Sequence, residues 1–429
     1  MKKSWFLKAA GVAAMALLLV GCGKSATTTN TKKAAEPVKI TYWHRMTGSY
    51  KTALDHLIKQ FNDSQKQYKV VGVSQGSYDA LQQKIMAAAK SKTLPTLSQT
   101  PYTNIGDYVK NDFLIPFDDQ MLNGDNKLSA AQLADIYPSF LESGKYQGKY
   151  YGLPFSVSTS ILFYNKDLMT KYNVQLPKTW DDVATAGKIL KPQKLTAMAL
   201  DNSYDVTLES MAQQAGHQLI TKDLKANLNA PTTLAAVNKL LTLRKDGYLQ
   251  TAGQDWYFDV ALINKKAVFG VGSSASIPDM AQHAPKDMNW GTATIPSYNG
   301  NTGTPLNGND NVMFKGATKT QQAGAWAFNK FLLKAESTAY WAEKTGYVPV
   351  TKSGTDSQSY QDYLKQNPAY QAAVDAVPAS FGSTIFAGYN DYRNQLMSTV
   401  DLTLTKNKDG KTAFDELQAK TEPILKAAK

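Results

Sequence analysis

The sequence predicts an α/β protein built as two lobes, and three observations lead to this fold class. Patterns typical of strands alternate with patterns typical of helices over residues 38–108, which predicts a largely parallel sheet covered on both faces. A chain of 429 residues is too long for one ordinary core. The stretch 152–183 is polar at one end and continuously apolar further on, as expected of a segment that leaves one lobe, crosses a cleft and enters a second.

The first 22 residues have the pattern of an export signal. Lys2, Lys3 and Lys8 form a basic start, and the apolar run that follows over residues 9–20 is shorter than the about 20 residues that a transmembrane helix needs. The run ends in LVGC, which is similar to a bacterial lipobox, where the cysteine becomes the lipidated first residue of the mature protein. The alternative is a plain secretory signal with a chance cysteine. We therefore expect a lipoprotein signal peptide over residues 1–22 and an anchor at Cys22 on the extracellular face of the cell membrane.

The remaining composition favours an exported globular protein. Cys22 is the single cysteine, so no intramolecular disulfide can form and a large core has to stabilise the fold. Residues 23–37 are polar and contain no aromatic side chain, which predicts a flexible tether. We interpret the formal charge of +12 as solubilising surface lysine, with anionic substrates as the alternative. No block dense in Lys and Arg is interleaved with aromatic side chains, so we expect no nucleic-acid partner.

Periodicity locates most of the elements. Strands are predicted at 38–43, 68–73, 96–99, 196–200, 267–271, 292–296 and 312–315. Apolar residues three and four apart predict helices at 52–63, 81–89, 105–108, 327–332, 337–344, 391–404 and 412–426, and residues 180–288 are mostly helical in pattern. The Gly- and Asn-rich stretch 297–311 is predicted to be a loop, and Gly346 has the position of a C′ glycine.

The stretch 152–183 itself predicts a strand followed by two helices. Alternation from Leu153 to Thr159 becomes a continuous apolar run at Ile161–Tyr164, which is short enough for a strand buried on both faces. A turn and a short helix follow. The second helix is predicted to begin at Thr179 as N-cap, with Asp182 three residues on completing a capping box.

Motifs for catalysis or metal binding are missing from the sequence. None of the four histidines has zinc-ligand spacing with another, and one cysteine cannot build a thiolate site. No nucleophile elbow or P-loop occurs. The segment Gly270–Ala275 matches G-x-G-x-x-A after a strand, but no acidic residue ends a second strand about 20 residues on, so a dinucleotide site is not expected. A strand that ends in small residues before a helix still presents N–H groups that favour an anion. We expect no enzyme, no cofactor and no metal.

The stretch GLPFSVSTSILFYNKDL, residues 152–168, followed by PKTWDDV, resembles the crossover of the extracellular solute-binding proteins, family 1, that feed ABC importers. Other segments resemble the glycerol-3-phosphate-binding receptors of this group: Tyr42–Met46, Gly76–Tyr78, Gly272–Ser274 and Lys344–Lys352. The resemblance implies a two-lobed periplasmic-binding-protein-like fold of type II with discontinuous lobes. These would be residues 38–157 plus 312–379 and residues 158–311 plus 380–429, joined by hinge crossings near 158, 308–312 and 380–386.

Position by position, the resemblance implies a phosphate site and a further ligand contact, Tyr78. The phosphate-site positions are Ser158, Ser273, Gly308, Tyr347 and Arg393. This set suits a phosphate monoester, because an arginine fork grips two oxygens, hydroxyls donate to others, and a glycine N–H is unobstructed. The resemblance also implies that Tyr78 and Tyr347 come from the lobe opposite to Ser273. Trp43 and His44 are interpreted as core and strand-end packing.

The other half of the expected pocket departs from the family pattern. Tyr102 stands where the glycerol-phosphate receptors carry a glutamate, and Asn202 and Asp205 stand where they carry two tryptophans. This places free glycerol-3-phosphate in doubt as the ligand. Asp205 is interpreted either as facing a cationic head group, as in glycerophosphocholine, or as a helix N-cap.

These residues are compatible with three functions. The first is a lipid-anchored, monomeric receptor that closes by hinge motion on glycerol-3-phosphate or a glycerophosphodiester and delivers it to ABC permease subunits. The second is the same receptor for a sugar or oligosaccharide, with Asp255, Trp256 and Tyr257 as a candidate wall. The remote third is a secreted hydrolase, which needs two carboxylates facing each other about 5–9.5 Å apart, and the sequence designates no such pair.

Overall fold

The computed structural model describes residues 36–406 and 408–429, of which Pro37–Lys429 belong to one compact unit. The predicted signal peptide, Cys22 and residues 23–35 of the predicted tether lie outside the described residues. The main sheet has eleven strands, eight of which follow one another in the order β2-β1-β3-β12-β7-β10-β8-β9. Its other members are β11, which pairs with β7, and β4 and β13, which pair with β12.

The bounds of the elements agree with most of the predicted ranges. The strands are β1 (Val38–His44), β2 (Tyr68–Ser74), β3 (Leu97–Thr100), β4 (Leu114–Ile115), β7 (Gly152–Asn165), β8 (Thr196–Leu200), β9 (Leu249–Thr251), β10 (Ala267–Ser273), β11 (Trp290–Thr294), β12 (Thr304–Phe314) and β13 (Ser380–Phe381), with a separate hairpin of β5 (Lys145–Tyr146) and β6 (Lys149–Tyr150). The principal helices are α1 (Gly48–Ser64), α2 (Tyr78–Ser91), α3 (Ile105–Lys110), α6 (Lys166–Tyr172), α7 (Trp180–Leu190), α8 (Tyr204–Gln214), α9 (Pro231–Lys245), α11 (Ile277–His283), α12 (Lys319–Leu332), α13 (Ala335–Thr345), α15 (Gln358–Gln366), α17 (Tyr389–Lys406) and α18 (Gly410–Ala428). Shorter helices are α4 (Ala130–Asp135), α5 (Pro138–Glu142), α10 (Asp259–Ile263), α14 (Lys352–Thr355) and α16 (Gln371–Asp375).

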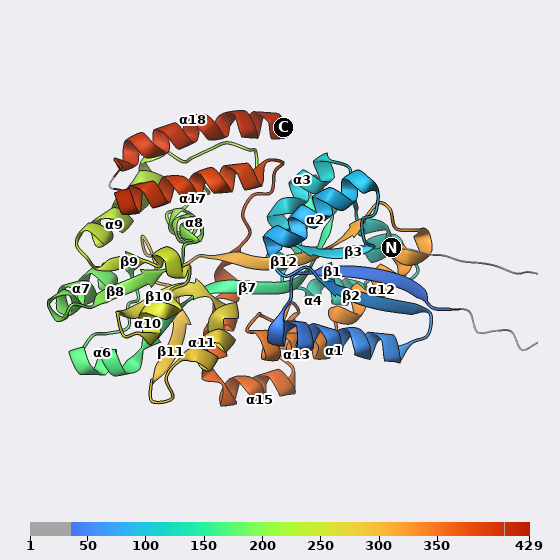
Figure 1. Ribbon diagram of the computed structural model, residues 1–429, viewed down its shortest axis with the longest axis horizontal. Helices are drawn as coiled ribbons and strands as arrows, with labels where there is room; N and C mark the ends of the chain where they lie inside the picture. The colour runs from blue at the N-terminus through green and yellow to red at the C-terminus, as the bar shows by residue number, and fades with distance from the viewer. Residues whose placement is uncertain (1–35, 407) are drawn as a thin grey trace, which may run out of the picture. The chain divides into compact units, whose positions relative to one another are not determined.

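The first group of elements surrounds the parallel strands β1, β2 and β3. Both β2 and β3 pair with β1 in parallel, as the alternation of strand and helix predicted. Helix α1 buries Leu54, Leu57, Ile58 and Phe61, whose spacing fits one helical face, and Figure 1 shows α1 beside α13. His44 is fully buried at the end of β1, in agreement with its interpretation as strand-end packing.

The second group surrounds β8, β9 and β10. Strand β8 is parallel to both β9 and β10, and β10 and β11 are antiparallel to β7. Helices α17 and α18 lie side by side over this group (Figure 1), and their apolar residues share one core with α7, α8 and α9. The predicted start of α7 is confirmed, because Thr179 Oγ1 accepts from the Asp182 N–H at 3.1 Å and Asp182 Oδ2 accepts from the Thr179 N–H at 2.9 Å.

Strands β7 and β12 connect the two groups (Figure 1). Residues 152–159 of β7 pair with β12, and residues 160–165 pair with β10 and β11. Beyond its pairing with β7, β12 also pairs with β3 through residues 310–313. Strand β13 pairs with the start of β12, and the chain then continues into α17. These are the three segments at which the resemblance placed its crossings, while the lobe boundaries stay a prediction.

The prediction of a loop over residues 297–311 is wrong for most of its length, because Thr304–Phe314 form β12. Glycine and asparagine disfavour strands locally, but pairing with β7 on one side and β3 on the other satisfies the backbone. The buried amides also find partners: Asn311 Nδ2 donates to Asn329 Oδ1 at 2.9 Å, and Asn309 Nδ2 donates to the Tyr78 hydroxyl at 2.8 Å. Tertiary contacts therefore override the local preference.

Gly308 gives a direct test of the β7–β12 pairing. Its φ is +114°, and a Cβ there would lie 1.8 Å from the backbone oxygen of Ser156. We expect Gly308→Ala to lower the free energy of unfolding by about 2–4 kcal/mol in urea titration, because the substitution combines backbone strain with a backbone clash. Gly316→Ala is the control, since a Cβ at Gly316 meets nothing within 4 Å. Equal stability of the two variants would contradict the strained pairing.

Candidate functional site

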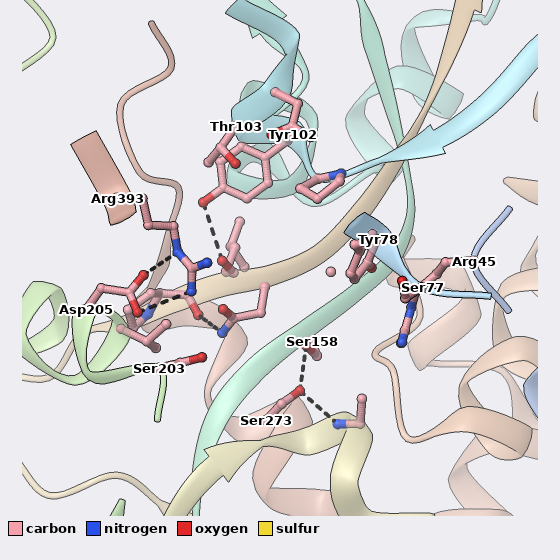
Figure 2. A pocket seen from close by; sticks show the side chains of 18 of the residues that line it. Arg45, Ser77, Tyr78, Tyr102, Thr103, Ser158, Ser203, Asp205, Ser273 and Arg393 are labelled. Atoms are coloured by element: carbon pink, nitrogen blue, oxygen red, sulfur yellow. Dashed lines mark hydrogen bonds and ion pairs between the residues drawn. The ribbon is translucent and has the colours of Figure 1, made fainter. Parts of the chain in front are cut away.

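A cavity of about 640 Å³ lies between the two groups of elements, and residues from both groups line it. All eight predicted ligand-binding residues are among its lining residues: Tyr78, Tyr102, Ser158, Asp205, Ser273, Gly308, Tyr347 and Arg393. Figure 2 shows side chains from separate elements pointing toward this common space. The cavity size falls within the range of pockets for small organic molecules.

Ser158 and Ser273 meet where β7 passes from one group to the other. Ser273 ends β10, and its Oγ donates to Ser158 Oγ at 2.8 Å (Figure 2). Ser273 Oγ also accepts from the N–H of Ala275 at 3.1 Å and so caps the short helix after β10. One of the N–H groups that the sequence predicted to be free for an anion at this strand end therefore already donates to Ser273. The hydroxyls of Ser158 and Ser273 form the polar floor of the cavity.

Two tyrosines approach from the first group. Tyr78 begins α2, and Tyr347 follows α13 and packs in the same core as β1 and α1. Burial raises the pKa of Tyr78 above its ordinary value, so its hydroxyl stays neutral. The Tyr347 hydroxyl accepts from Arg45 Nη2 at 2.9 Å, and the Arg45 guanidinium lies 4.7 Å from the centre of the Tyr78 ring. Both tyrosines thus come from the group opposite to Ser273, as the resemblance implied.

Arg393 and Asp205 form an ion pair on another side of the cavity (Figure 2). Arg393 Nε donates to Asp205 Oδ2 at 2.5 Å, and Nη2 donates to Oδ1 at 3.2 Å. The Asp205 side chain is 7% exposed and that of Arg393 is 37% exposed. One edge of the guanidinium is therefore already bound, and its remaining N–H groups are those left for a ligand.

The alternative interpretation of Asp205 as a helix N-cap is wrong. Ser203 is the N-cap of α8, and Asp205 lies inside the first turn. Its carboxylate accepts from Arg393 instead of from the backbone N–H groups at the helix start. Asp205 therefore orients a cation in the cavity wall.

A partly buried chain of polar groups links Tyr102 to Glu209, which is one turn after Asp205 on α8. The backbone N–H of Ser383 donates to the Tyr102 hydroxyl at 2.9 Å, and Ser383 Oγ donates to Glu209 Oε2 at 2.8 Å. Burial raises the pKa of Glu209 to about 7, and the neighbouring carboxylate of Asp205 adds to this shift while Arg393 and the Ser383 hydroxyl oppose it. A carboxylate is thus present near Tyr102, although it comes from a different part of the chain than in the family pattern.

Two exposed aromatic side chains stand in the cavity wall. Trp256 is 64% exposed and Tyr257 is 60% exposed, and both line the cavity, whereas Asp255 does not. Trp256 has a φ of +66°, a strained value for a residue with a side chain. Its backbone oxygen accepts from the Asn202 N–H at 3.0 Å, and Asp201 Oδ1 accepts from the N–H of Phe258 at 2.8 Å. These bonds hold the loop in its strained form.

The described part of the chain contains no group of three or more His, Cys, Asp or Glu side chains arranged to hold a metal ion. No helix within residues 36–406 and 408–429 combines the length and apolarity needed to cross a membrane.

Comparison with known proteins decides the family. The model of the bacterial extracellular solute-binding proteins matches residues 56–372, well over half of the chain. The chain belongs to this family. This solute-binding protein is 23% identical over 416 residues to the sn-glycerol-3-phosphate-binding periplasmic protein UgpB of Brucella melitensis. The aligned region covers 92% of this chain and 95% of the relative. It is 24% identical over 380 residues to the protein of that name from Escherichia coli K12, covering 85% and 84%.

Solved structures confirm the fold class. UgpB from Mycobacterium tuberculosis, in complex with glycerophosphocholine, matches with a TM-score of 0.79 at 20% identity, over 92% of this chain and 99% of that one. The cyclic α-maltosyl-1,6-maltose-binding protein of Arthrobacter globiformis matches with a TM-score of 0.80 at 21% identity, over 91% and 100%. The predicted α/β fold of the periplasmic-binding-protein type is therefore confirmed. The protein is a solute-binding receptor of the ABC-importer class, and its family is one of receptors and not of enzymes.

Sequence reasoning missed four charged residues of this receptor's cavity, Arg45, Asp79, Glu209 and Asp279. Arg45 directly follows β1, a parallel strand, and ligands bind in α/β sheets beyond the carboxyl ends of such strands. This position at the end of a parallel strand could have identified Arg45 as a site residue from the sequence. Glu209 carried no local signal, because it reaches the cavity only through the packing of α8 against α17.

The shifted pKa of Glu209 has a measurable consequence for stability. The folded state binds its proton more tightly than the unfolded chain, so the free energy of unfolding falls as pH rises from about 4.5 to about 7, and the loss is complete above that window. We expect Glu209→Gln, which still accepts from Ser383, to gain about 2 kcal/mol relative to wild type between pH 5 and pH 8. Urea unfolding at both pH values measures this difference. A difference between variant and wild type that stays constant with pH would contradict the shift.

Proposed function

We propose that this solute-binding protein is a receptor for glycerol-3-phosphate or a glycerophosphodiester, which it binds in the cavity between the two groups and delivers to its permease. The observation that carries the proposal is the arrangement of Ser158, Ser273, Tyr347 and Arg393 around one cavity. Neutral hydroxyls and a fixed arginine suit a phosphoryl group, because charge-assisted hydrogen bonds each contribute roughly 1.5–3 kcal/mol. The relatives whose names specify glycerol-3-phosphate add support.

The acidic side of the cavity favours a diester with a cationic head group over the monoester. Asp205 and Glu209 line the cavity beside Arg393, so anion- and cation-binding groups lie next to one another. A zwitterionic ligand such as glycerophosphocholine carries both charges at short range. The ligand named for the Mycobacterium tuberculosis structure agrees with this preference.

Delivery requires that ligand binding changes the shape that the permease meets. We propose that the two groups act as lobes, residues 38–157 plus 312–379 and residues 158–311 plus 380–429, which close about β7, β12 and the segment 380–386. A ligand that contacts both lobes stabilises the closed state by population shift. The Tyr50 hydroxyl on α1 already donates to the backbone oxygen of Ala275 at 2.8 Å, so contacts between the groups are available at the edge of the cavity. The receptor would act as a monomer held at the membrane through a lipid on Cys22.

A sugar or oligosaccharide is the second candidate ligand, and the exposed pair Trp256 and Tyr257 is the observation that favours it. Sugar rings stack on exposed aromatic faces, and a strained loop conformation is typical of functional sites. The structure from Arthrobacter globiformis is named for a cyclic maltosyl-maltose.

Arg393→Lys tests the organophosphate proposal, because lysine keeps the charge and loses the planar fork. We expect binding of glycerol-3-phosphate and glycerophosphocholine to residues 24–429 to weaken at least about tenfold in isothermal titration calorimetry. Arg244→Lys, in α9 and outside the cavity lining, is the matched control and should bind like wild type. Wild-type protein that binds neither organophosphate would overturn the proposal.

Trp256→Ala separates the two ligand classes. For a sugar that stacks on this side chain, we expect about tenfold weaker binding of maltose or maltotriose and unchanged binding of glycerophosphocholine. Thermal-shift titration measures both, since a ligand that binds only the folded form raises the melting temperature. Saccharide binding that is indifferent to Trp256→Ala would remove the argument for the sugar.

A further inference from the structure

Arginine is rare in this protein and concentrated at the cavity. Only three of its 47 basic side chains are arginine, namely Arg45, Arg244 and Arg393, and all others are lysine. Two of the three arginines line the cavity, and no lysine of the described residues does. Arginine differs from lysine in its planar fork, which matches the oxygen pairs of phosphate and carboxylate groups. Two arginine side chains therefore line the cavity, and the predicted site included only one of them, Arg393.

The two arginines differ in charge balance. Asp205 neutralises Arg393 through two hydrogen bonds. No carboxylate of the described residues lies within 4 Å of the Arg45 nitrogens. The side-chain partners of Arg45 are the Tyr347 hydroxyl and the face of the Tyr78 ring, both of which are uncharged. Asp79 and Asp279 also line the cavity, and the charge of Arg45 acts on Asp279, but neither carboxylate forms an ion pair with Arg45.

Arg45 is also held ready for a further contact. Its backbone N–H donates to Gln99 Oε1 at 3.2 Å, which fixes the residue after β1. The Tyr347 hydroxyl and the Tyr78 ring restrict the guanidinium, and its one side-chain hydrogen bond to the described residues, from Nη2, leaves its other N–H groups unused. An oriented guanidinium with an unused donor loses little side-chain entropy when an anion binds.

We propose that Arg45 is a ligand-binding residue whose guanidinium, which no carboxylate of the described residues pairs with, contacts the phosphoryl group of the ligand. Figure 2 shows Arg45 and Tyr78 on the side of the cavity away from Arg393 and Asp205, with Ser158 and Ser273 on the floor. Arg45 then joins Ser158, Ser273, Tyr347 and Arg393 around the phosphoryl group, and the remainder of the ligand extends toward Asp205 and Glu209. Because Arg45 belongs to the first group and Ser273 to the second, one phosphoryl group contacts both. The inference rests on the proposed organophosphate function and names the residue that selects an anionic ligand.

The test compares Arg45→Gln, Arg45→Lys and Arg244→Gln by isothermal titration calorimetry with glycerol-3-phosphate and with glycerophosphocholine. We expect Arg45→Gln to weaken binding about 10- to 100-fold, Arg45→Lys to weaken it less, and Arg244→Gln to leave it unchanged. The affinity of wild type should fall as NaCl rises from 20 to 500 mM, and Arg45→Gln should lose most of this dependence, because salt screens the charge that the substitution removes. A purely structural role of Arg45 would not change the salt dependence.

Three results separate the possibilities. Melting temperatures of the unliganded variants show whether Arg45→Gln is folded, and Arg45→Lys keeps the test valid if that variant is unstable. Organophosphate binding that survives both Arg45 substitutions within twofold, with its salt dependence intact, would overturn this inference and leave the proposed function standing. Wild-type protein that binds maltose but neither organophosphate would overturn the proposed function and this inference with it.

Discussion

The antiparallel pairing of β7 with β12 is the constraint on which the cavity depends. Strand β7 pairs with β10 of the second group, β12 pairs with β3 of the first, and the two pair with each other, so their register sets where the floor of the cavity lies relative to both walls. Ser158 and Gly308 lie on these two strands, and the backbone of Gly308 approaches Ser156 too closely for any side chain. A register change of one residue would turn Ser158 away from Ser273 and place a neighbouring side chain in its position. The geometry of the site is therefore a property of the sheet more than of the loops around it.

Charge is distributed unevenly around this floor. On one side the Asp205 carboxylate pairs with Arg393, and on the other the guanidinium of Arg45 contacts the phenol groups of Tyr78 and Tyr347, with no carboxylate of the described residues within 4 Å. Partly buried charges that face uncharged neighbours interact strongly with an incoming counter-charge, because little water screens them. The arrangement gives the two ends of the cavity different charge patterns, with an arginine that no carboxylate pairs with at one end and an arginine–carboxylate pair beside an acid at the other.

Much of the fold could be predicted from the sequence, because the signals of the first group are local. The alternation in β1 and β2 and the apolar face of α1 need only neighbouring residues to be recognised, and the capping box at Thr179 is contained within four residues. Strand β12 could not be predicted in the same way. Its Asn and Gly residues disfavour a strand, and their partners, such as Asn329 and Tyr78, lie far away in the sequence.

The same contrast between local signals and long-range contacts applies to the site. The eight residues taken from the resemblance all line one cavity, whereas Arg45 and Glu209 were missed and the unbound arginine fork expected at Arg393 is occupied on one edge by Asp205. Residue types at matching positions indicate which side chains come together. They do not indicate which of them pair with one another, because Arg393 and Asp205 lie on different helices and are 188 positions apart in the sequence. Partial occupation of the fork is a property of packing that only coordinates reveal.

The position of Glu209 links the orientation of the bound ligand to the release or uptake of a proton. With a pKa of about 7, this carboxyl group is present in both protonation states near neutral pH. A cationic head group placed beside it favours the ionised form, so binding releases a proton, whereas a phosphoryl group placed beside it favours the protonated form, so binding takes one up. The direction of proton exchange on binding therefore indicates which end of a glycerophosphodiester faces α8. Since Ser383 bridges Glu209 and Tyr102, the same exchange reports on the wall in which this receptor departs from the pattern of the glycerol-phosphate family.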